Sequence, residues 1–263
     1  MIFDGNLCSK NQIGLSDLHV HSNFCDGKNT PEQLILSAIE KGLKTVGIVM
    51  HSHIPNSFYQ NFNCDDEFQT QMNALKIKYQ DKIKVLCGLE MDILSTKKSG
   101  YDYIIGSVHM FNKNGKLFDV DRSKEYFVET VKNCFNGDYF LAVEDYFQNV
   151  EKVIKVTNAD IIGHFDLITK FNLDNCLFDE NDARYVNAWQ KAVDKLIPYG
   201  KPFEINLGGI ARNYKKTPYP SFAIMQYIKE KGGKFILTSD AHTTEKVAFE
   251  FEKWKIELEK FFD

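Results

Sequence analysis

All seven histidines of this 263-residue chain stand in short apolar segments that end like the strands of a barrel. The first two form a His-x-His pair. Because side chains on a strand alternate with period 2, both rings of that pair lie on one face and can chelate one ion. Imidazole binds zinc, iron and manganese-type ions. The pattern therefore predicts one imidazole-rich metal site, with candidate ligands His19, His21, His51, His109, His164 and His242.

Acidic residues occur at the same strand ends. Glu90 lies in CGLEMD, Asp240 lies in TSDAH, and Asp26 follows the His-x-His pair. Carboxylates can bridge two ions and balance their charge, which neutral imidazoles cannot do. The sequence therefore favours a cluster of more than one divalent ion, with Zn, Fe and Mn all compatible with these ligands.

The elements that would position these residues alternate between strand-like and helical runs, which predicts βα units and a parallel sheet. In TPEQLILSAIEKG, Thr30 is placed to cap a helix, Pro31 to begin it and Gln33 to complete a capping box. We expect further helices over 65–80, 122–135, 142–156, 180–197, 220–231 and 244–261, and strands near 15–20, 45–49, 83–89, 103–108, 160–163, 202–206 and 234–238.

A closed parallel barrel brings the carboxyl ends of its strands to one rim, where barrel active sites lie. The chain has the length of an α/β barrel, and no linker, repeat or composition shift divides it. We therefore predict a single domain over residues 1–263 with an α/β fold, a distorted (β/α)7 TIM-like barrel.

The composition limits the classes of partner and the cellular location that we expect. The net charge is -4 at pH 7, which offers no global attraction for nucleic acid. The six cysteines include no C-x-x-C pair, which is typical of reduced cytosolic thiols. The first 14 residues do not resemble a signal peptide, and no stretch approaches the about 18 apolar residues of a membrane span. We expect a cytoplasmic protein, a monomer or small homo-oligomer, with neither nucleic acid nor membrane as partner.

The motifs also occur in a familiar order. DLHVHSNFCDG, GIVMHSH, GLEMD, IIGSVH, IIGHFDLI and TSDAH resemble the successive motifs of the polymerase and histidinol phosphatase (PHP) superfamily. EINLGGIARNYKKTPYPS is similar to a segment of its monofunctional histidinol-phosphate phosphatases. The resemblance implies a PHP-type barrel with three divalent ions: the first held by His19, His21, Glu90 and Asp240, the second by Glu90, His109 and His164, and the third by Asp26, His51 and His242.

Three residues have no ligand role in this resemblance. Met50 stands where the family usually has an acidic residue, and Cys25 stands where a small Ser is common. We expect these two departures to alter the surroundings of the ligands rather than metal binding itself. His53 matches no ligand position, so we expect it to be a structural residue or to lie at the rim.

The resemblance and the ligand chemistry imply a metal-dependent phosphomonoesterase that converts L-histidinol phosphate to L-histidinol and phosphate in histidine biosynthesis. Ions held by carboxylates such as Glu90 and Asp240, with Glu90 shared between two of them, lower the pKa of a bridging water, and the resulting hydroxide can attack phosphorus. Arg212 follows a strand whose end lies at the site, and its guanidinium can grip two phosphate oxygens. Glu204 and Asn206 share one face of that strand, where they either orient the substrate's amino or imidazole group or satisfy polar groups of the barrel.

The sequence is also compatible with other functions. The chain could be another PHP phosphoesterase, namely a 3′ exonuclease or a phosphotyrosine phosphatase, although an exonuclease should have a basic groove with stacking aromatics. Amidohydrolase barrels also begin with His-x-His and end with an Asp, but they commonly bridge their ions with a modified lysine where this chain has Glu90. A metal-binding or regulatory protein without turnover is the remaining alternative.

Overall fold

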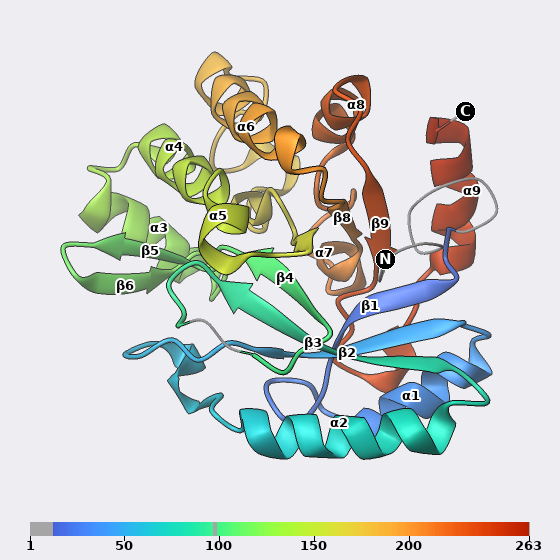
Figure 1. Cartoon of the computed structure of the whole chain (residues 1–263). Coiled ribbons are helices and arrows are strands. Elements are labelled where there is room, and N and C mark those ends of the chain that lie inside the picture. Colours follow the sequence, from blue (N-terminus) through green and yellow to red (C-terminus); the bar gives the residue numbers. More distant parts are fainter. Residues whose placement is uncertain (1–12, 97–98, 263) are drawn as a thin grey trace.

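A nearly closed barrel of parallel strands forms the centre of the computed structural model, which describes residues 13–96 and 99–262 (Figure 1). The sheet has the strand order β1-β2-β3-β4-β7-β8-β9. Just beyond β9 the chain returns to β1, where the His21 amide donates a hydrogen bond to the Ala241 carbonyl at 2.7 Å. The predicted distorted seven-stranded α/β barrel is confirmed, and its strands are β1 (Ser16–His21), β2 (Thr45–His51), β3 (Lys84–Asp92), β4 (Tyr103–Ser107), β7 (Ile161–Ile162), β8 (Phe203–Asn206) and β9 (Phe235–Thr238).

An apolar plug fills the barrel on the amino-terminal side of the histidines. The ring of Tyr103 crosses the interior, and its hydroxyl donates a hydrogen bond to the Leu18 carbonyl at 2.6 Å. A side chain at Gly47 would collide with this ring, so the strand requires glycine there. This apolar cluster fills the barrel below the polar strand ends. It consists of Leu18, Val49, Leu86, Tyr103, Ile105, Ile161 and Ile236.

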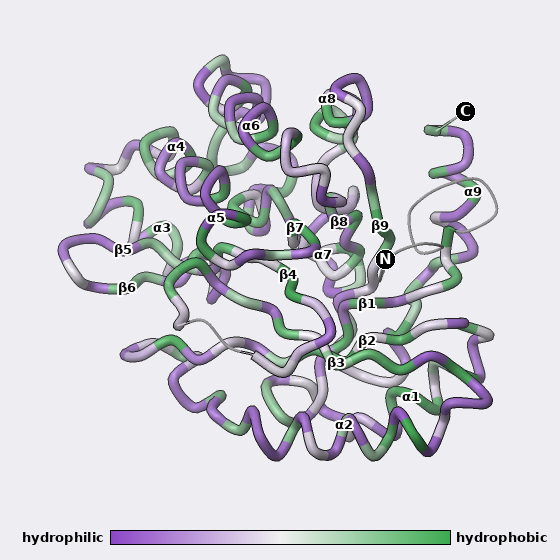
Figure 2. The backbone as a smooth tube through the Cα atoms, in the orientation of Figure 1, coloured by the Kyte–Doolittle hydropathy of each residue, from purple (hydrophilic) through white to green (hydrophobic). Residues whose placement is uncertain are grey.

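Helices surround the barrel, and their apolar faces cover the outer side of the strands, as the hydropathy colours show (Figure 2). The first, α1 (Pro31–Glu40), begins with the predicted capping box, in which the Gln33 amide donates to the Thr30 hydroxyl and the Thr30 amide donates to the Gln33 side chain. The other long helices are α2 (Asp65–Tyr79), α3 (Lys124–Cys134), α4 (Tyr139–Val150), α6 (Ala183–Leu196), α8 (Phe222–Glu230) and α9 (Phe251–Phe262).

Two predicted helices are wrong in extent. The segment 142–156 is divided between α4 and the short α5 (Val153–Thr157). The last helix begins at Phe251 rather than at residue 244, because Ala248 and Glu250 both adopt φ of 51° and interrupt the chain after the turn η5 (Thr244–Lys246). Short helical turns also occur at η2 (Leu167–Thr169), η3 (Leu173–Asn175), η4 (Ile197–Tyr199) and α7 (Gly208–Ala211).

A two-stranded hairpin was not predicted. It joins β5 (Met110–Lys113) to β6 (Lys116–Asp119) directly after the histidine that follows β4. Its turn is Asn114-Gly115, with φ of 53° and 79°, and Asn-Gly is the preferred dipeptide for two-residue hairpin turns. The dipeptide was therefore a signal in the sequence, although the strands on either side are short.

Within residues 13–96 and 99–262, none of the helices combines the length and apolar character that crossing a bilayer requires. The prediction about the first 14 residues concerns a segment that lies almost entirely outside the described residues.

Candidate metal centre

The nine predicted metal ligands lie together at the carboxyl-terminal rim of the barrel, in one connected cluster. Glu90, at the end of β3, is at its centre and is 1% exposed. His164 Nε2 is 2.7 Å and His109 Nε2 is 3.1 Å from its Oε1. Three further imidazole nitrogens lie within 3.2 Å of its Oε2, namely His19 Nε2, His21 Nε2 and His51 Nδ1.

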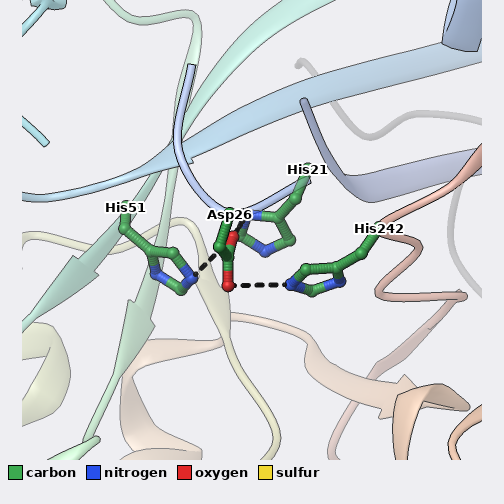
Figure 3. A group of neighbouring side chains, drawn as sticks. All are labelled: His21, Asp26, His51 and His242. Carbon is green, nitrogen blue, oxygen red and sulfur yellow. Dashed lines mark hydrogen bonds and ion pairs between the residues drawn. The ribbon is translucent and has the colours of Figure 1, made fainter. Parts of the chain in front are cut away.

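Asp26 lies close to a second set of histidine rings on the more open side of the cluster (Figure 3). Its Oδ2 lies 3.2 Å from His242 Nε2, and its Oδ1 lies 3.6 Å from His51 Nε2 and 3.7 Å from His21 Nδ1. His51 thus faces Asp26 with one ring nitrogen and Glu90 with the other.

Asp240 completes the cluster from the segment after β9. Its Oδ1 lies 3.6 Å from His21 Nε2 and 3.8 Å from His19 Nε2. The φ of Asp240 is 52°, a conformation uncommon outside glycine that is often kept at functional sites. Among residues 13–96 and 99–262, three sets of donor atoms are compact enough to hold an ion: His21, Asp26, His51 and His242; His19, His21 and Glu90; and His51, Glu90 and His109.

The electrostatics of the cluster favour bound positive charge. Burial alone would lower the pKa of His19, but the carboxylates of Glu204, Glu90 and Asp240 raise that pKa well above its ordinary value. Burial likewise opposes ionisation of Glu90, yet the surrounding histidines hold the pKa of Glu90 well below its usual range. The buried carboxylates therefore stay ionised and create a surplus of negative charge, which protons or metal cations can balance.

The donor geometry also fits a metal ion. His19 Nε2 and His21 Nε2 face each other at 3.0 Å, while His19 Nδ1 faces the carboxylate of Glu204. In the neutral tautomer that donates from Nδ1 to this carboxylate, His19 Nε2 carries a lone pair directed at the second ring. A cation between the two nitrogens and Glu90 satisfies all of these donor atoms at once.

Glu204 lies behind the ligands instead of facing a substrate. It is 0% exposed, and its Oε1 accepts hydrogen bonds from His19 Nδ1 at 2.5 Å and from the Thr238 hydroxyl at 2.7 Å. Its Oε2 accepts from the backbone amide of His164 at 2.7 Å. Both oxygens accept hydrogen bonds from the barrel, which supports the alternative in which Glu204 satisfies polar groups of the barrel and orients the ring of His19.

Asn206 is also sealed from solvent. Its Oδ1 accepts a hydrogen bond from the Gly208 amide at 2.8 Å, which shapes the turn after β8. Its Nδ2 is buried and has no hydrogen-bond partner among the residues of the described structure. This burial supports the alternative in which Asn206 satisfies polar groups of the barrel.

Arg212 lies at the rim beside Asp240. Its Nη2 donates to Asp240 Oδ2 at 2.7 Å, and its Nη1 lies 3.1 Å from His242 Nδ1. The side chain is 36% exposed, so the guanidinium is both fixed and accessible. A side chain at Gly208 would collide with Asp240 and Arg212, and glycine is needed there for this pair to form.

Other residues near the ligands were not assigned roles from the sequence. Asp92 Oδ2 accepts a hydrogen bond from the His109 amide at 2.7 Å, and the Ser107 hydroxyl donates to Glu90 Oε1 at 2.9 Å. The period-2 alternation of GLEMD places Asp92 on the same side of the strand as Glu90, and this was the available signal.

The three residues without expected ligand roles have different surroundings. Met50 is fully buried in the main core, and His53 belongs to none of the three compact donor sets. Cys25 Sγ lies 3.4 Å from His21 Nδ1. Cys25 therefore touches a ligand ring and can influence its orientation, while Met50 fills space.

Comparison with known proteins shows both sequence and structural similarity. Residues 17–207 match the model of the PHP domain family. A Schizosaccharomyces pombe protein named "Probable histidinol-phosphatase" is 27% identical over 92% of this chain and 85% of its own length. A Lactococcus lactis protein named "Histidinol-phosphatase" is 28% identical over 86% of this chain and 83% of its own length.

Two crystal structures share the fold. The Listeria monocytogenes protein hisK superposes with a TM-score of 0.78 at 19% identity, covering 91% of this chain and 99% of its own. The histidinol phosphate phosphatase of Lactococcus lactis, solved with Zn, L-histidinol and phosphate, superposes with a TM-score of 0.64 at 23% identity and covers 93% and 92% of the two chains.

Proposed function

The chain belongs to the PHP domain family, and from this membership we propose that it is a metal-dependent phosphomonoesterase that hydrolyses L-histidinol phosphate to L-histidinol and phosphate. The observation that carries the reaction class is the convergence of five imidazoles on the buried carboxylate of Glu90. The substrate is supported by the names of the relatives and by the L-histidinol and phosphate in the Lactococcus lactis structure.

In this proposal the nine clustered side chains hold three divalent ions of Zn, Fe or Mn type. Shared carboxylates and overlapping donor sets support more than one ion. When bound, such ions supply Lewis acidity, which brings the pKa of water towards neutrality and offsets charge on the phosphoryl oxygens. The ligands are His19, His21, Asp26, His51, Glu90, His109, His164, Asp240 and His242.

The remaining task of the chain is to orient the phosphoryl group. Arg212 has a guanidinium that Asp240 fixes at 2.7 Å while about a third of the side chain stays exposed. Since a guanidinium offers several donors in one plane, Arg212 can donate to a phosphoryl oxygen without releasing Asp240. Glu204 contributes indirectly, by holding His19 in the orientation that directs Nε2 to Glu90.

We also propose a substrate class, a cellular location and an oligomeric state for the enzyme. A net charge of -4 supports a small phosphate monoester as substrate in preference to nucleic acid. We assign the protein to the cytoplasm, in histidine biosynthesis, as a monomer or small homo-oligomer.

Phosphate release from a substrate panel tests the proposal. Purified protein reconstituted separately with Zn, Mn and Fe should show its highest kcat/KM with L-histidinol phosphate, compared with phosphotyrosine and a 3′-phosphorylated oligonucleotide. The Glu90→Gln variant, prepared in the same way, should be inactive and thereby controls for contaminating phosphatases. Equal rates with the other monoesters would show that the substrate assignment is wrong.

A further inference from the structure

An aromatic turn after β2 covers two of the metal ligands. In η1 (Phe58–Asn61), the ring of Tyr59 lies 4.8 Å from the ring of His51 in an edge-on arrangement and 5.3 Å from the ring of His109. These two histidines come from different strands, and both contact Glu90 at 3.1 Å. Tyr59 therefore lies directly against the donor set formed by His51, Glu90 and His109.

Packing fixes the ring of Tyr59 in this position. The residue is 6% exposed and forms a small apolar cluster with Ile54 and Met110, the latter at the start of the unpredicted hairpin. Phe58 and Phe62 contact the ring edge-on, with centroids 5.5 Å and 5.9 Å away. The hydroxyl is thus carried by a side chain with little freedom to move.

The hydroxyl of Tyr59 itself has no hydrogen bond to any of the residues that the structure describes. The hydroxyls of Tyr185 and Tyr219 are also unpaired, but they are sealed from solvent, whereas that of Tyr59 is not among the sealed atoms. Burial raises the pKa of this hydroxyl well above its ordinary value, and the carboxylates of Asp121 and Glu90 raise it further, so the phenol keeps its proton. A phenol oxygen in apolar surroundings ordinarily has a hydrogen-bond partner, so this one is free to bind a ligand at the site.

We propose that the hydroxyl of Tyr59 donates a hydrogen bond to a phosphoryl oxygen of the substrate. The inference rests on the proposed phosphatase function. Phosphoryl oxygens only accept hydrogen bonds, and a neutral phenol has one proton to donate. Arg212 contacts His242 at the other end of a row of stacked rings formed by His242, His21 and His51. The hydroxyl of Tyr59 and the guanidinium of Arg212 therefore approach the cluster from different sides.

The Tyr59→Phe variant tests this role, because it removes the hydroxyl and keeps the ring that packs on His51 and His109. We expect kcat/KM for phosphate-ester hydrolysis to fall about 10- to 100-fold, the scale of one hydrogen bond to a charged group. The inhibition constant of inorganic phosphate should rise by a similar factor. Metal content per chain should stay at the level of the unchanged protein.

Tyr227→Phe is the matched control, since it removes the hydroxyl that contacts Asp194 on the outer helices, and its kinetics should not change. An unchanged phosphate inhibition constant in Tyr59→Phe would overturn the inference, as would a loss of metal that accounts for the lower rate. Calorimetric binding of inorganic phosphate provides the same comparison without turnover. If the protein prefers another phosphate monoester, the proposed substrate fails while the binding comparison still decides the role of Tyr59.

Discussion

Replacing Glu204 by Gln separates a role in orienting a ligand from a role in binding substrate. The carboxylate accepts three hydrogen bonds, from His19 Nδ1 at 2.5 Å, the Thr238 hydroxyl at 2.7 Å and the His164 amide at 2.7 Å. A Gln amide has one oxygen and one NH2 group, so one of these buried donors must face another donor. An unsatisfied buried donor costs about 1–3 kcal/mol.

The loss of this hydrogen bond should lower mainly the affinity of the protein for metal. Disturbing an outer partner of a metal-ligating histidine typically lowers metal affinity or activity about 10- to 100-fold, which agrees with that energy. Competition with a chelator, followed by metal analysis, measures the affinity directly. Thr238→Val is the control, because it removes one of the two hydrogen bonds to Oε1 and leaves those to His19 and His164 in place.

The two possible roles of Glu204 predict different effects of the Glu204→Gln substitution. If Glu204 contacted the amino or imidazole group of the substrate, Glu204→Gln would raise KM for histidinol phosphate and leave metal affinity unchanged. If instead Glu204 orients His19, metal affinity falls, and kcat at saturating metal also reflects the misplaced ring. An enzyme with full metal content and normal kinetics would contradict both roles.

Three further perturbations test other parts of the site. Arg212→Ala should lower kcat/KM about 10²- to 10³-fold, the effect of losing one transition-state donor, with metal content retained; unchanged kinetics would remove Arg212 from the site. Burial raises the pKa of Asp166 from 3.8 to about 6. Because the unfolded chain loses this proton at lower pH than the folded protein does, the carboxyl group destabilises the folded state as pH rises from about 4 to about 6. Asp166→Asn should therefore raise the free energy of unfolding above about pH 6 by at most about 3 kcal/mol. This gain should vanish below about pH 4 in urea titrations, and an equal gain at both pH values would exclude titration of Asp166 as its cause. Removal of metal by a chelator should abolish hydrolysis and lower the Tm, because ligands that bind only the folded state stabilise it, by about 4 kcal/mol at 1,000 times Kd; an unchanged Tm on calorimetry would show that no ion had been bound.

The strands and the gathering of the candidate ligands could be predicted because burial and chemistry leave strong local signals. Each barrel strand is a short apolar run, and each ligand follows or ends such a run, as His164 follows β7. The barrel then brings together residues as distant in sequence as His19 and Asp240. Local patterns also predicted α1, whose capping box is complete within the four residues from Thr30 to Gln33.

Roles that depend on tertiary contacts were not predictable in the same way. Glu204 lies at the end of a strand with the alternation of an inward-facing residue, but only the fold shows that its carboxylate contacts the ring of His19. Tyr59 lies in a segment without clear periodicity, and its contact with His51 depends on how the hairpin after His109 packs against that segment. The break before α9 is another tertiary effect, because the Ala248 amide donates to Asp17 at 2.9 Å, which fixes a non-helical turn in a helix-compatible sequence.

The assembly of the metal cluster requires closure of the barrel. Its ligands come from both edges of the seven-stranded sheet, since β1 carries His19 and His21 while the segment after β9 carries Asp240 and His242. These edges are joined by the His21–Ala241 backbone hydrogen bond and by Asp17, which accepts from the Ser239 amide at 3.0 Å. Ions bound across this junction would hold the same two edges together, so metal binding and barrel closure must stabilise each other by thermodynamic linkage. A weaker junction should therefore lower metal affinity even when every ligand is present.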